Sequence, residues 1–150
     1  MKLYILTLFP ELFQSVFEKS IIKRAQTQKK VEINFINIRD FGIGKHKQVD
    51  DKPYGGGEGM VMMVEPIEKA LNTIKPKPYT ILLAASGERF TQKKAGKLAT
   101  KKNIAIICGH YEGIDARVEN FANETISIGD FVLTGGEIPA MLIVDAITRL

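Results

Sequence analysis

Short apolar runs typical of β-strands alternate with amphipathic stretches typical of helices along most of this chain. The strand patterns cover residues 2–7, 31–38, 79–84, 104–108 and 124–128, and the helical patterns cover residues 10–25, 65–74, 91–100, 113–121 and 137–150. This alternation predicts an α/β fold, in which a mostly parallel sheet carries helices on both faces. The continuous apolar runs at 81–84 and 104–107 are typical of strands that are buried on both sides.

The stretch 39–64 interrupts this regular pattern. Its first half is charged, and its second half contains the run Lys52-Pro-Tyr-Gly-Gly-Gly-Glu-Gly-Met60. A loop of this length inside a compact domain is usually functional or disordered. Because Tyr54 and Met60 are mixed with the glycines, we expect a functional loop. For the glycine run alone, a mobile turn without a functional role is the alternative interpretation.

The final helical pattern, 137–150, is apolar except for Glu137, Asp145, Thr148 and Arg149. At 100° per residue these four positions fall within roughly a third of the helix circumference. We therefore expect a helix that is buried on most of its surface, either in the core or against a partner chain. It stops without a C-cap glycine or a following proline, so we expect the natural chain to continue.

Length and composition restrict the class of protein. The chain has 150 residues, 45% of them hydrophobic and 25% charged, which fits one compact domain. No apolar run approaches the length of about 20 residues that a membrane span needs. A single cysteine cannot form an internal disulfide, so we expect a reducing cytoplasm.

The net charge of +4 hides an asymmetry. Residues 1–102 carry 19 Lys and Arg against 10 Asp and Glu, whereas residues 103–150 carry 2 against 7. A basic surface beside an acidic, glycine-rich pocket suits a polyanionic substrate that brings a reactive centre into the pocket. Lysines that simply solvate helix faces remain an equally good explanation of the charge.

Two glycine-rich turns in the last third of the chain carry the strongest functional signal. In each of the blocks 104–117 and 126–140, an apolar strand leads into a glycine turn and then a helix. Glycine lets a ligand approach the main chain closely, so the two turns predict a small-molecule site built mostly from backbone groups. Neither a Walker A loop nor a Rossmann fingerprint is present, which argues against a kinase, a GTPase or an ordinary dehydrogenase.

The other reactive side chains have plain structural explanations. Cys108 stands at a strand end, and a buried, inert thiol is the favoured interpretation. One cysteine with His46 and His110 makes a structural zinc site improbable. Capping of helix starts explains Asp115 and Glu137. Arg149 either pairs with Asp145 four residues earlier or faces a cleft, where it would stabilise developing negative charge.

Five blocks in order resemble the bacterial tRNA (guanine-N1)-methyltransferase family, within the trefoil-knotted SPOUT methyltransferases. They are Leu8-Phe-Pro-Glu-Leu-Phe13, Val49-Asp-Asp-Lys-Pro-Tyr-Gly-Gly-Gly57, Gly59-Met-Val-Met-Met63, Cys108-Gly-His-Tyr-Glu-Gly-Ile-Asp-Ala-Arg117 and Ser127-Ile-Gly-Asp-Phe-Val-Leu-Thr-Gly-Gly-Glu-Ile-Pro-Ala-Met141. The resemblance covers essentially the whole chain. It implies an α/β SPOUT fold over residues 1–150, whose C-terminal strands thread a deep knot, an exception to the rule against knots.

The resemblance also implies a cofactor, S-adenosylmethionine, bound in the knot against three walls at 82–87, 109–113 and 128–136. A side chain at the glycines of these walls would occupy cofactor volume. The cofactor-binding residues expected from the resemblance are Leu82, Leu83, Ala84, Ala85, Gly87, Gly109, Tyr111, Gly113, Ile128, Gly129, Leu133, Gly135 and Gly136.

The implied reaction is methyl transfer to N1 of the tRNA guanine just 3′ of the anticodon. Arg149 matches the family position that stabilises charge on the guanine oxygen, and Glu112 matches a carboxylate near the guanine pocket, where magnesium dependence has also been placed. These two are the expected catalytic residues. The expected substrate-binding residues, which would shape the base pocket with Tyr111, are Tyr54, Gly55, Gly56, Gly57, Glu58 and Gly59.

The family further implies a cytoplasmic homodimer, with the last helix against the second subunit. Its members continue into a linker that carries an aspartate general base and into a tRNA-binding domain, both absent from these 150 residues. We therefore expect this chain to bind cofactor and dimerise but to methylate poorly alone. Alanine and serine at 85 and 86 replace the usual proline and glutamine, and Glu58 replaces a proline. These departures leave room for one alternative, a SPOUT methyltransferase with another RNA target. A second alternative is a non-catalytic module that binds S-adenosylmethionine and RNA.

Overall fold

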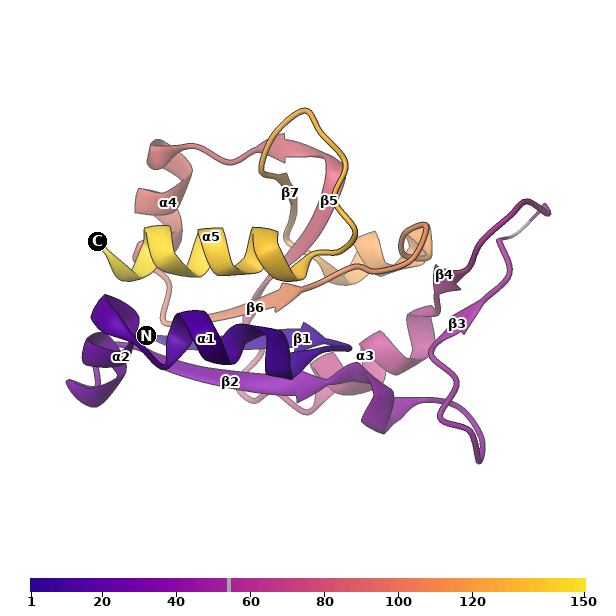
Figure 1. Cartoon of the computed structure of the whole chain (residues 1–150), viewed down its shortest axis with the longest axis horizontal. Helices are drawn as coiled ribbons and strands as arrows, with labels where there is room; N and C mark the ends of the chain where they lie inside the picture. Colours follow the sequence, from indigo (N-terminus) through magenta and orange to yellow (C-terminus); the bar gives the residue numbers. More distant parts are fainter. Residues whose placement is uncertain (54) are drawn as a thin grey trace.

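A five-stranded sheet forms the centre of the molecule in a computed structural model, which describes residues 1–53 and 55–150. The strands lie in the order β2-β1-β6-β5-β7, and every neighbouring pair is parallel (Figure 1). Their bounds are β1 Lys2–Thr7, β2 Glu32–Asn37, β5 Tyr79–Arg89, β6 Asn103–Ile107 and β7 Glu124–Ser127. The prediction of a mostly parallel α/β fold is confirmed.

The central strands are buried on both faces, as their continuous apolar runs predicted. Leu3 and Ile5 of β1 contribute to one hydrophobic cluster, and Leu6 of the same strand contributes to the other. Alternate residues of β6 divide in the same way, because successive side chains of a strand point to opposite faces.

Helices cover both faces of this sheet. The first cluster lies under α1 (Gln14–Phe17), α2 (Ser20–Thr27), α4 (Gln92–Ala99) and α5 (Glu137–Thr148), which share one side of the sheet in Figure 1. The second cluster lies under α3 (Val64–Asn72) and the 3₁₀ helices η2 (Ile38–Phe41) and η3 (Ala116–Phe121). The C-terminal end of α5 lies near α2 (Figure 1).

Three predicted elements differ from the structure. The helix expected over 10–25 is divided into η1 (Pro10–Phe13), α1 and α2, because Lys19 is extended and Ser20 takes a left-handed φ of 52°. The helix expected over 113–121 is a 3₁₀ helix that begins only at Ala116. The third strand is longer than expected and runs on to Arg89.

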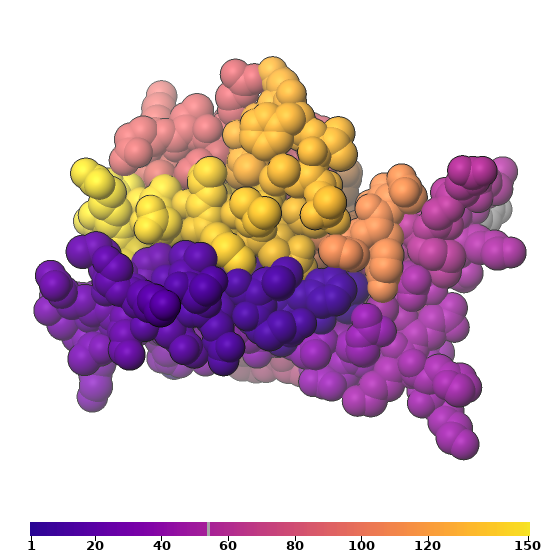
Figure 2. Space-filling model, in the orientation of Figure 1, coloured from indigo at the N-terminus to yellow at the C-terminus, as the bar shows by residue number. Residues whose placement is uncertain are grey.

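The irregular stretch 39–64 contains a short antiparallel hairpin that the sequence pattern did not predict. Its strands are β3 (Asp50–Asp51) and β4 (Val61–Met62), each too short to show a periodicity. The hairpin extends from one end of the molecule in Figures 1 and 2. Within the described residues, no helix has the length and apolarity needed to span a bilayer.

Candidate functional site

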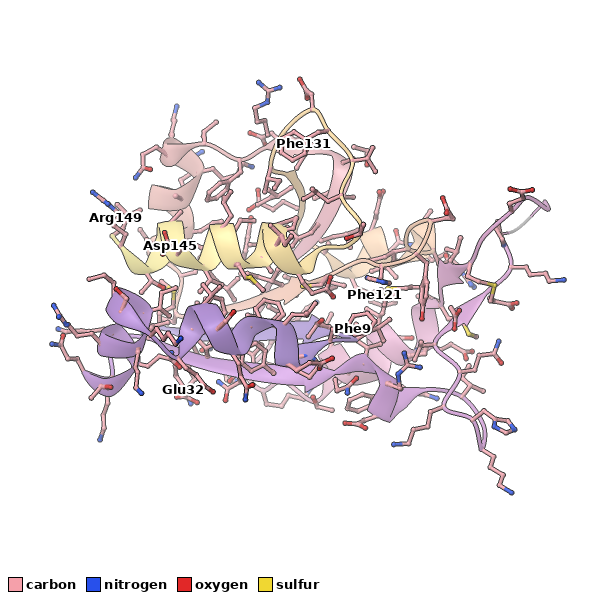
Figure 3. The ribbon with its side chains drawn as sticks, in the orientation of Figure 1. Phe9, Glu32, Phe121, Phe131, Asp145 and Arg149 are labelled. Carbon is pink, nitrogen blue, oxygen red and sulfur yellow. The ribbon has the colours of Figure 1, made fainter. Side chains whose placement is uncertain are left out.

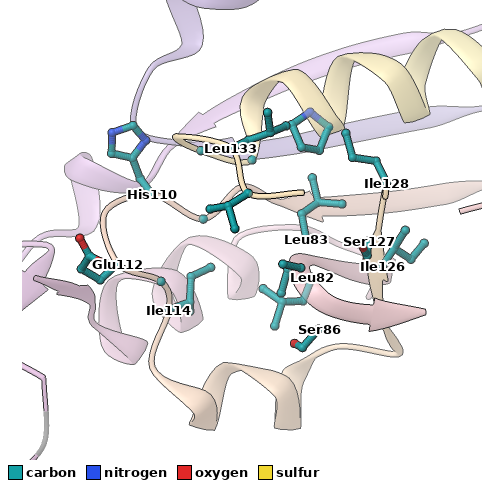
Figure 4. A pocket seen from close by; sticks show the side chains of 18 of the residues that line it. Leu82, Leu83, Ser86, His110, Glu112, Ile114, Ile126, Ser127, Ile128 and Leu133 are labelled. Atoms are coloured by element: carbon teal, nitrogen blue, oxygen red, sulfur yellow. The ribbon is translucent and has the colours of Figure 1, made fainter. Parts of the chain in front are cut away.

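A cavity of about 480 Å³ lies at the C-terminal ends of β6 and β7, beside the middle of β5 (Figure 4). In parallel sheets this edge is the usual place for a ligand. The cavity is lined by all but one of the predicted cofactor-binding residues, namely Leu82, Leu83, Ala84, Ala85, Gly109, Tyr111, Gly113, Ile128, Gly129, Leu133, Gly135 and Gly136. The three predicted walls therefore converge on one space.

The first wall is an excursion of the main chain within β5. Leu83 and Glu88 both pair with Ile126 of β7, so the residues between them bulge out of the sheet. Gly87 is the exception among the predicted cofactor contacts, because it does not line the cavity. A Cβ atom there would lie 2.6 Å from the backbone nitrogen of Ile126, so packing against β7 is the reason for this glycine.

A lysine of α4 holds the end of this excursion. The ammonium of Lys94 lies 2.7 Å from a carboxylate oxygen of Glu88 and 2.6 Å from one of Glu124 in β7. Burial alone would lower the pKa of Lys94, but the hydrogen bonds to the two carboxylates outweigh it and the pKa is raised. The bridge thus joins β5, β7 and α4 just beyond the first wall.

The second wall, 109–113, follows β6 and is tied to the β3–β4 hairpin. The backbone nitrogen of Met62 donates to the carbonyl of Gly113 over 3.0 Å, and that of Glu112 donates to Met60 over 3.0 Å. Tyr111 has a left-handed φ of 60°, an uncommon conformation for a residue with a side chain. The hairpin and the cavity wall therefore form one hydrogen-bonded unit.

The third wall, 128–136, returns from β7 across the second wall and enters α5. The backbone nitrogen of Gly136 donates to the carbonyl of Gly109 over 2.7 Å. A Cβ atom at Gly136 would lie 2.7 Å from Cα of Cys108. The expectation that a side chain here would occupy cofactor volume is therefore wrong for Gly136, where it would instead meet the neighbouring backbone.

The carboxylates near the cavity have different partners. Asp115 accepts a hydrogen bond from the backbone nitrogen of Arg117 over 2.9 Å, which confirms its predicted capping role. Hydrogen bonds from the Arg117 side chain hold the pKa of Asp115 below its ordinary value. The capping role predicted for Glu137 is wrong. Its side chain makes no capping hydrogen bond to α5; it is buried and accepts a hydrogen bond from the hydroxyl of Thr7 over 2.8 Å. Glu112 also lines the cavity (Figure 4).

Neither Cys108 nor the acidic residues suggest a reactive or metal-binding centre. Cys108 is 1% exposed, and burial raises the pKa of its thiol well above the ordinary value, as an inert cysteine requires. Among the described residues, no group of three or more His, Cys, Asp or Glu side chains is arranged to hold a metal ion.

Arg149 lies away from this cavity. It is exposed at the C-cap of α5, whereas the cavity is at the helix N-terminus. Figure 3 shows Arg149 and Asp145 at the opposite end of α5 from the loop that carries Phe131. The backbone nitrogen of Arg149 donates to the carbonyl of Asp145 over 3.1 Å. In the described structure, no ion pair joins the side chains of these two residues. One copy of the chain thus does not bring Arg149 to Glu112.

The predicted base-pocket residues also lie outside the cavity lining. Gly55, Gly56, Gly57, Glu58 and Gly59 are exposed between β3 and β4. Gly59 packs directly against the Glu112 side chain, so this loop begins where the cavity ends. Tyr54 lies outside the described residues.

Several lining residues were not named among the expected contacts. Five of them stand within the predicted walls, namely Ser86, His110, Phe131, Val132 and Thr134. The others flank the walls and are Ile114, Asp115, Ala116, Glu119, Ile126, Ser127 and Pro139. Most of these flanking residues belong to the two glycine-rich blocks, so extending the second and third walls by a few residues would have included them.

Comparison with known proteins gives concordant results. Residues 1–150 match the family described as tRNA (Guanine-1)-methyltransferase TrmD. The chain is 56% identical over 152 residues to the tRNA (guanine-N(1)-)-methyltransferase of Carboxydothermus hydrogenoformans and 53% identical over 150 residues to that of Metamycoplasma arthritidis. All of the chain aligns in both cases, but it spans only 60% and 65% of those relatives.

A solved structure shows the same fold. The crystal structure of the tRNA (m1G37) methyltransferase from Aquifex aeolicus superposes with a TM-score of 0.93 and is 40% identical in sequence. The superposition covers 100% of this chain and 69% of that one.

Proposed function

Because the chain belongs to the tRNA (guanine-1)-methyltransferase family, we propose that residues 1–150 form its cofactor-binding domain. In this proposal the cavity binds S-adenosylmethionine, and the complete protein methylates N1 of the tRNA guanine 3′ to the anticodon in the cytoplasm. One observation carries the proposal: three separate segments expected to bind the cofactor line a single cavity.

The cavity suits this cofactor in size and chemistry. Its volume of about 480 Å³ falls within the range of small-molecule sites. Apolar side chains such as Leu82, Ile128 and Leu133 offer surfaces for an adenine ring (Figure 4). At Gly113, which has a φ of 139°, no atom lies within 4 Å of the place a Cβ would take, so backbone groups are accessible to a ligand.

The bound cofactor would supply an electrophilic methyl group. Around it, the chain's own residues would hold the reactants in line and keep water out, which accounts for a large part of catalysis in a two-substrate transfer. Glu112 stands between the cavity and the loop that contains Gly59. We therefore assign Glu112 to the guanine, as a carboxylate that holds the base beside the cofactor.

The described part of the chain contains no preformed site for magnesium. A magnesium ion at Glu112 would need further oxygen ligands, but the nearby carboxylate of Asp115 is hydrogen-bonded to Arg117.

We propose that two copies of the chain associate through α5. Residues at spacings of four, three and four form one exposed stripe on this helix, consisting of Ile138, Leu142, Asp145 and Arg149. Ile138 is 59% exposed and Leu142 44%, although they belong to a helix whose other side is fully buried. A second copy on this stripe would cover them and would give Arg149 a route to its partner's cavity, where its guanidinium would stabilise charge on the guanine oxygen.

The knot is also a proposal. The segment 128–136 pairs with the second wall through a bridge between His110 and Gly135 before the chain enters α5. This arrangement supports a C-terminal segment that passes through the loop formed by the preceding strands. The basic residues of 1–102 would then lie available for the tRNA phosphates.

The deciding experiment is calorimetric titration of the 150-residue chain with S-adenosylmethionine and S-adenosylhomocysteine. Saturable binding of both is expected, and a folded chain that binds neither would refute the cofactor assignment. Methyl transfer is then assayed with the remaining segment of the Carboxydothermus relative supplied in trans. A tRNA transcript with guanine 3′ to the anticodon should be methylated, and its adenine counterpart should not.

The alternatives predict different results in the same assay. Binding without turnover in trans would favour a non-catalytic module. Methylation of another RNA, but not of the guanine-containing tRNA, would favour a SPOUT enzyme with a different target.

A further inference from the structure

We propose that Glu137 is a positioning residue that closes onto His110 when the cofactor binds and thereby holds the second and third walls of the cavity together. The proposal rests on the assignment of the cavity to S-adenosylmethionine. Neither residue was named among the expected cofactor contacts. His110 belongs to the second wall after β6, and Glu137 directly follows the third wall as the first residue of α5.

Glu137 is an unusually placed carboxylate. Its side chain is 4% exposed, although an unpaired buried charge is costly. One oxygen, Oε1, accepts a hydrogen bond of 2.8 Å from the hydroxyl of Thr7, which is itself fully buried at the end of β1. The same hydroxyl oxygen accepts from the backbone nitrogen of Phe9 over 3.0 Å. The carboxylate is therefore fixed to the centre of the sheet and cannot turn freely.

The other oxygen of Glu137 faces an imidazole nitrogen without a partner. Oε2 lies 3.8 Å from Nδ1 of His110, which is beyond a hydrogen bond. Nδ1 is buried and has no hydrogen-bond partner within the described residues. The His110 ring packs against Phe9, with ring centroids 4.8 Å apart, and edge-on against Tyr111 at 5.1 Å. The imidazole is thus held in place, with its buried nitrogen directed toward the carboxylate.

The backbone of the third wall lies between these two groups. The place that a Cβ of Gly135 would take is in contact with both Oε2 of Glu137 and Nδ1 of His110. Gly135 also forms a β-bridge with His110. A movement of about 1 Å that brings Nδ1 to hydrogen-bond distance would draw the two walls together at this point. A ligand that contacts both walls gains from the closure, because binding can only favour a state with which it makes better contacts.

The other titratable groups around the pair do not compete for this contact. Cys108 lies beside Glu137, and burial followed by the Glu137 charge keeps its thiol protonated. Tyr111 and Glu112 are next along the second wall, and neither has a hydrogen bond to His110 in the described structure. Thr7 at the end of β1 and the nearby Phe9 contact the pair, and neither side chain carries a charge.

The test compares Glu137→Gln with Glu65→Gln in the 150-residue chain. Glutamine keeps the shape of the side chain and can still accept from Thr7, but it lacks the charge that strengthens the contact with His110. We expect S-adenosylmethionine to bind Glu137→Gln about tenfold more weakly, with a nearly unchanged melting temperature. Glu65 is the matched control, since it also occupies the first turn of a helix but is exposed away from the cavity.

Nuclear magnetic resonance reports on the contact itself. The chain contains two histidines, and His46 lies exposed on a loop, where it serves as an internal reference. In chain with ¹⁵N-labelled histidine, addition of S-adenosylmethionine should shift His110 toward the form protonated on Nδ1 and slow the exchange of that proton. His46 should not respond, and the His110 response should be absent in Glu137→Gln.

Each result has a distinct meaning. Equal cofactor affinity in wild type and Glu137→Gln, or an unchanged His110 signal on saturation, would overturn the positioning role while leaving the cofactor assignment intact. If wild type itself fails to bind, the proposed function fails first. If Glu137→Gln unfolds, Thr7→Val and Thr7→Ser decide: the proposal requires weaker binding in the valine variant and restored binding in the serine variant.

Discussion

Gly136 packs against the backbone of Cys108 so closely that even one added methyl group has no space between them. This contact joins the start of α5 to the end of β6, at the floor of the proposed cofactor cavity. The atoms that a methyl group would meet first, Cα of Cys108 and the backbone nitrogen of Gly109, belong to the main chain and cannot rotate away as a side chain could. Any residue larger than glycine at position 136 would therefore displace the third wall from the end of β6.

Gly136→Ala should lower the free energy of unfolding by roughly 1–3 kcal/mol and weaken cofactor binding, because the backbone must shift to admit the methyl group. Urea unfolding and calorimetry measure the two effects. Gly96→Ala is the matched control: it lies within α4, and no atom is within 4 Å of its Cβ position. That variant should be more stable by about 0.4–1 kcal/mol. Equal behaviour of the two variants would contradict the packing argument.

Lys94→Met should destabilise the fold by roughly 1–3 kcal/mol, since it removes the partner of the largely buried Glu124 carboxylate. Because the pKa of Lys94 is raised in the folded state, its contribution is present below the unfolded value of about 10.4 and is lost as the pH rises through the folded value. Urea unfolding of wild type and variant between pH 7 and strongly alkaline pH should show their difference shrinking.

Lys93→Met provides the comparison on the same helix, because Lys93 is exposed. It should change stability by less than about 0.5 kcal/mol. A similar loss in both variants would mean that the bridge to Glu88 and Glu124 contributes nothing specific.

Cys108 should resist alkylation in the folded protein. Its pKa is raised by burial and by the Glu137 charge, so the thiolate that reacts is scarce, and the sulfur is inaccessible. Iodoacetamide labelling followed by mass spectrometry should find little modification at pH 8 and complete modification in urea. The same shift predicts a free energy of unfolding that falls as the pH rises above about 8.5, where only the unfolded thiol ionises. Rapid labelling without denaturant would contradict this.

Leu142→Glu should weaken self-association without unfolding the chain. Leu142 is 44% exposed on the proposed α5 stripe, and a carboxylate there would be buried without a partner in a dimer. Light scattering during size-exclusion chromatography measures the mass. Val132→Glu is the control, since Val132 is 89% exposed in the loop before α5. A wild-type chain that is monomeric at high concentration would refute the dimer proposal itself.

Much of the fold follows from local patterns in the sequence. The bounds of the buried strands β1 and β6 were predicted closely, because a short, uninterrupted apolar run is typical of a strand that is covered on both faces. The bulge in β5 was missed, since the departure from the sheet depends on pairing with Ile126, some forty residues later. Hairpin β3–β4 was missed because two-residue strands have no period.

The walls of the site were predicted from family resemblance and glycine-rich turns, but their connections were not. Nothing near Thr7 in the sequence indicates that its hydroxyl meets Glu137, 130 residues away. Arg149 shows that a suitable residue type does not guarantee a suitable position. Its guanidinium fits the proposed chemistry, but within one chain it lies at the far end of α5 from the cavity. Long-range contacts and assembly decide such relationships, and a local pattern carries no information on either.

The strand order of the parallel sheet also has a consequence for folding during synthesis on the ribosome. β1 is synthesised before the other strands of the sheet, yet its second neighbour is β6, where Lys2 pairs with Asn103. At ordinary rates of synthesis of about 5–20 residues per second, roughly 5–20 s pass before that partner exists. During this interval one edge of β1, a strand that is buried on both faces in the folded protein, remains open. A nascent chain of this kind is a natural client for a chaperone at the ribosomal exit, and slow translation of the first hundred residues would prolong its exposure.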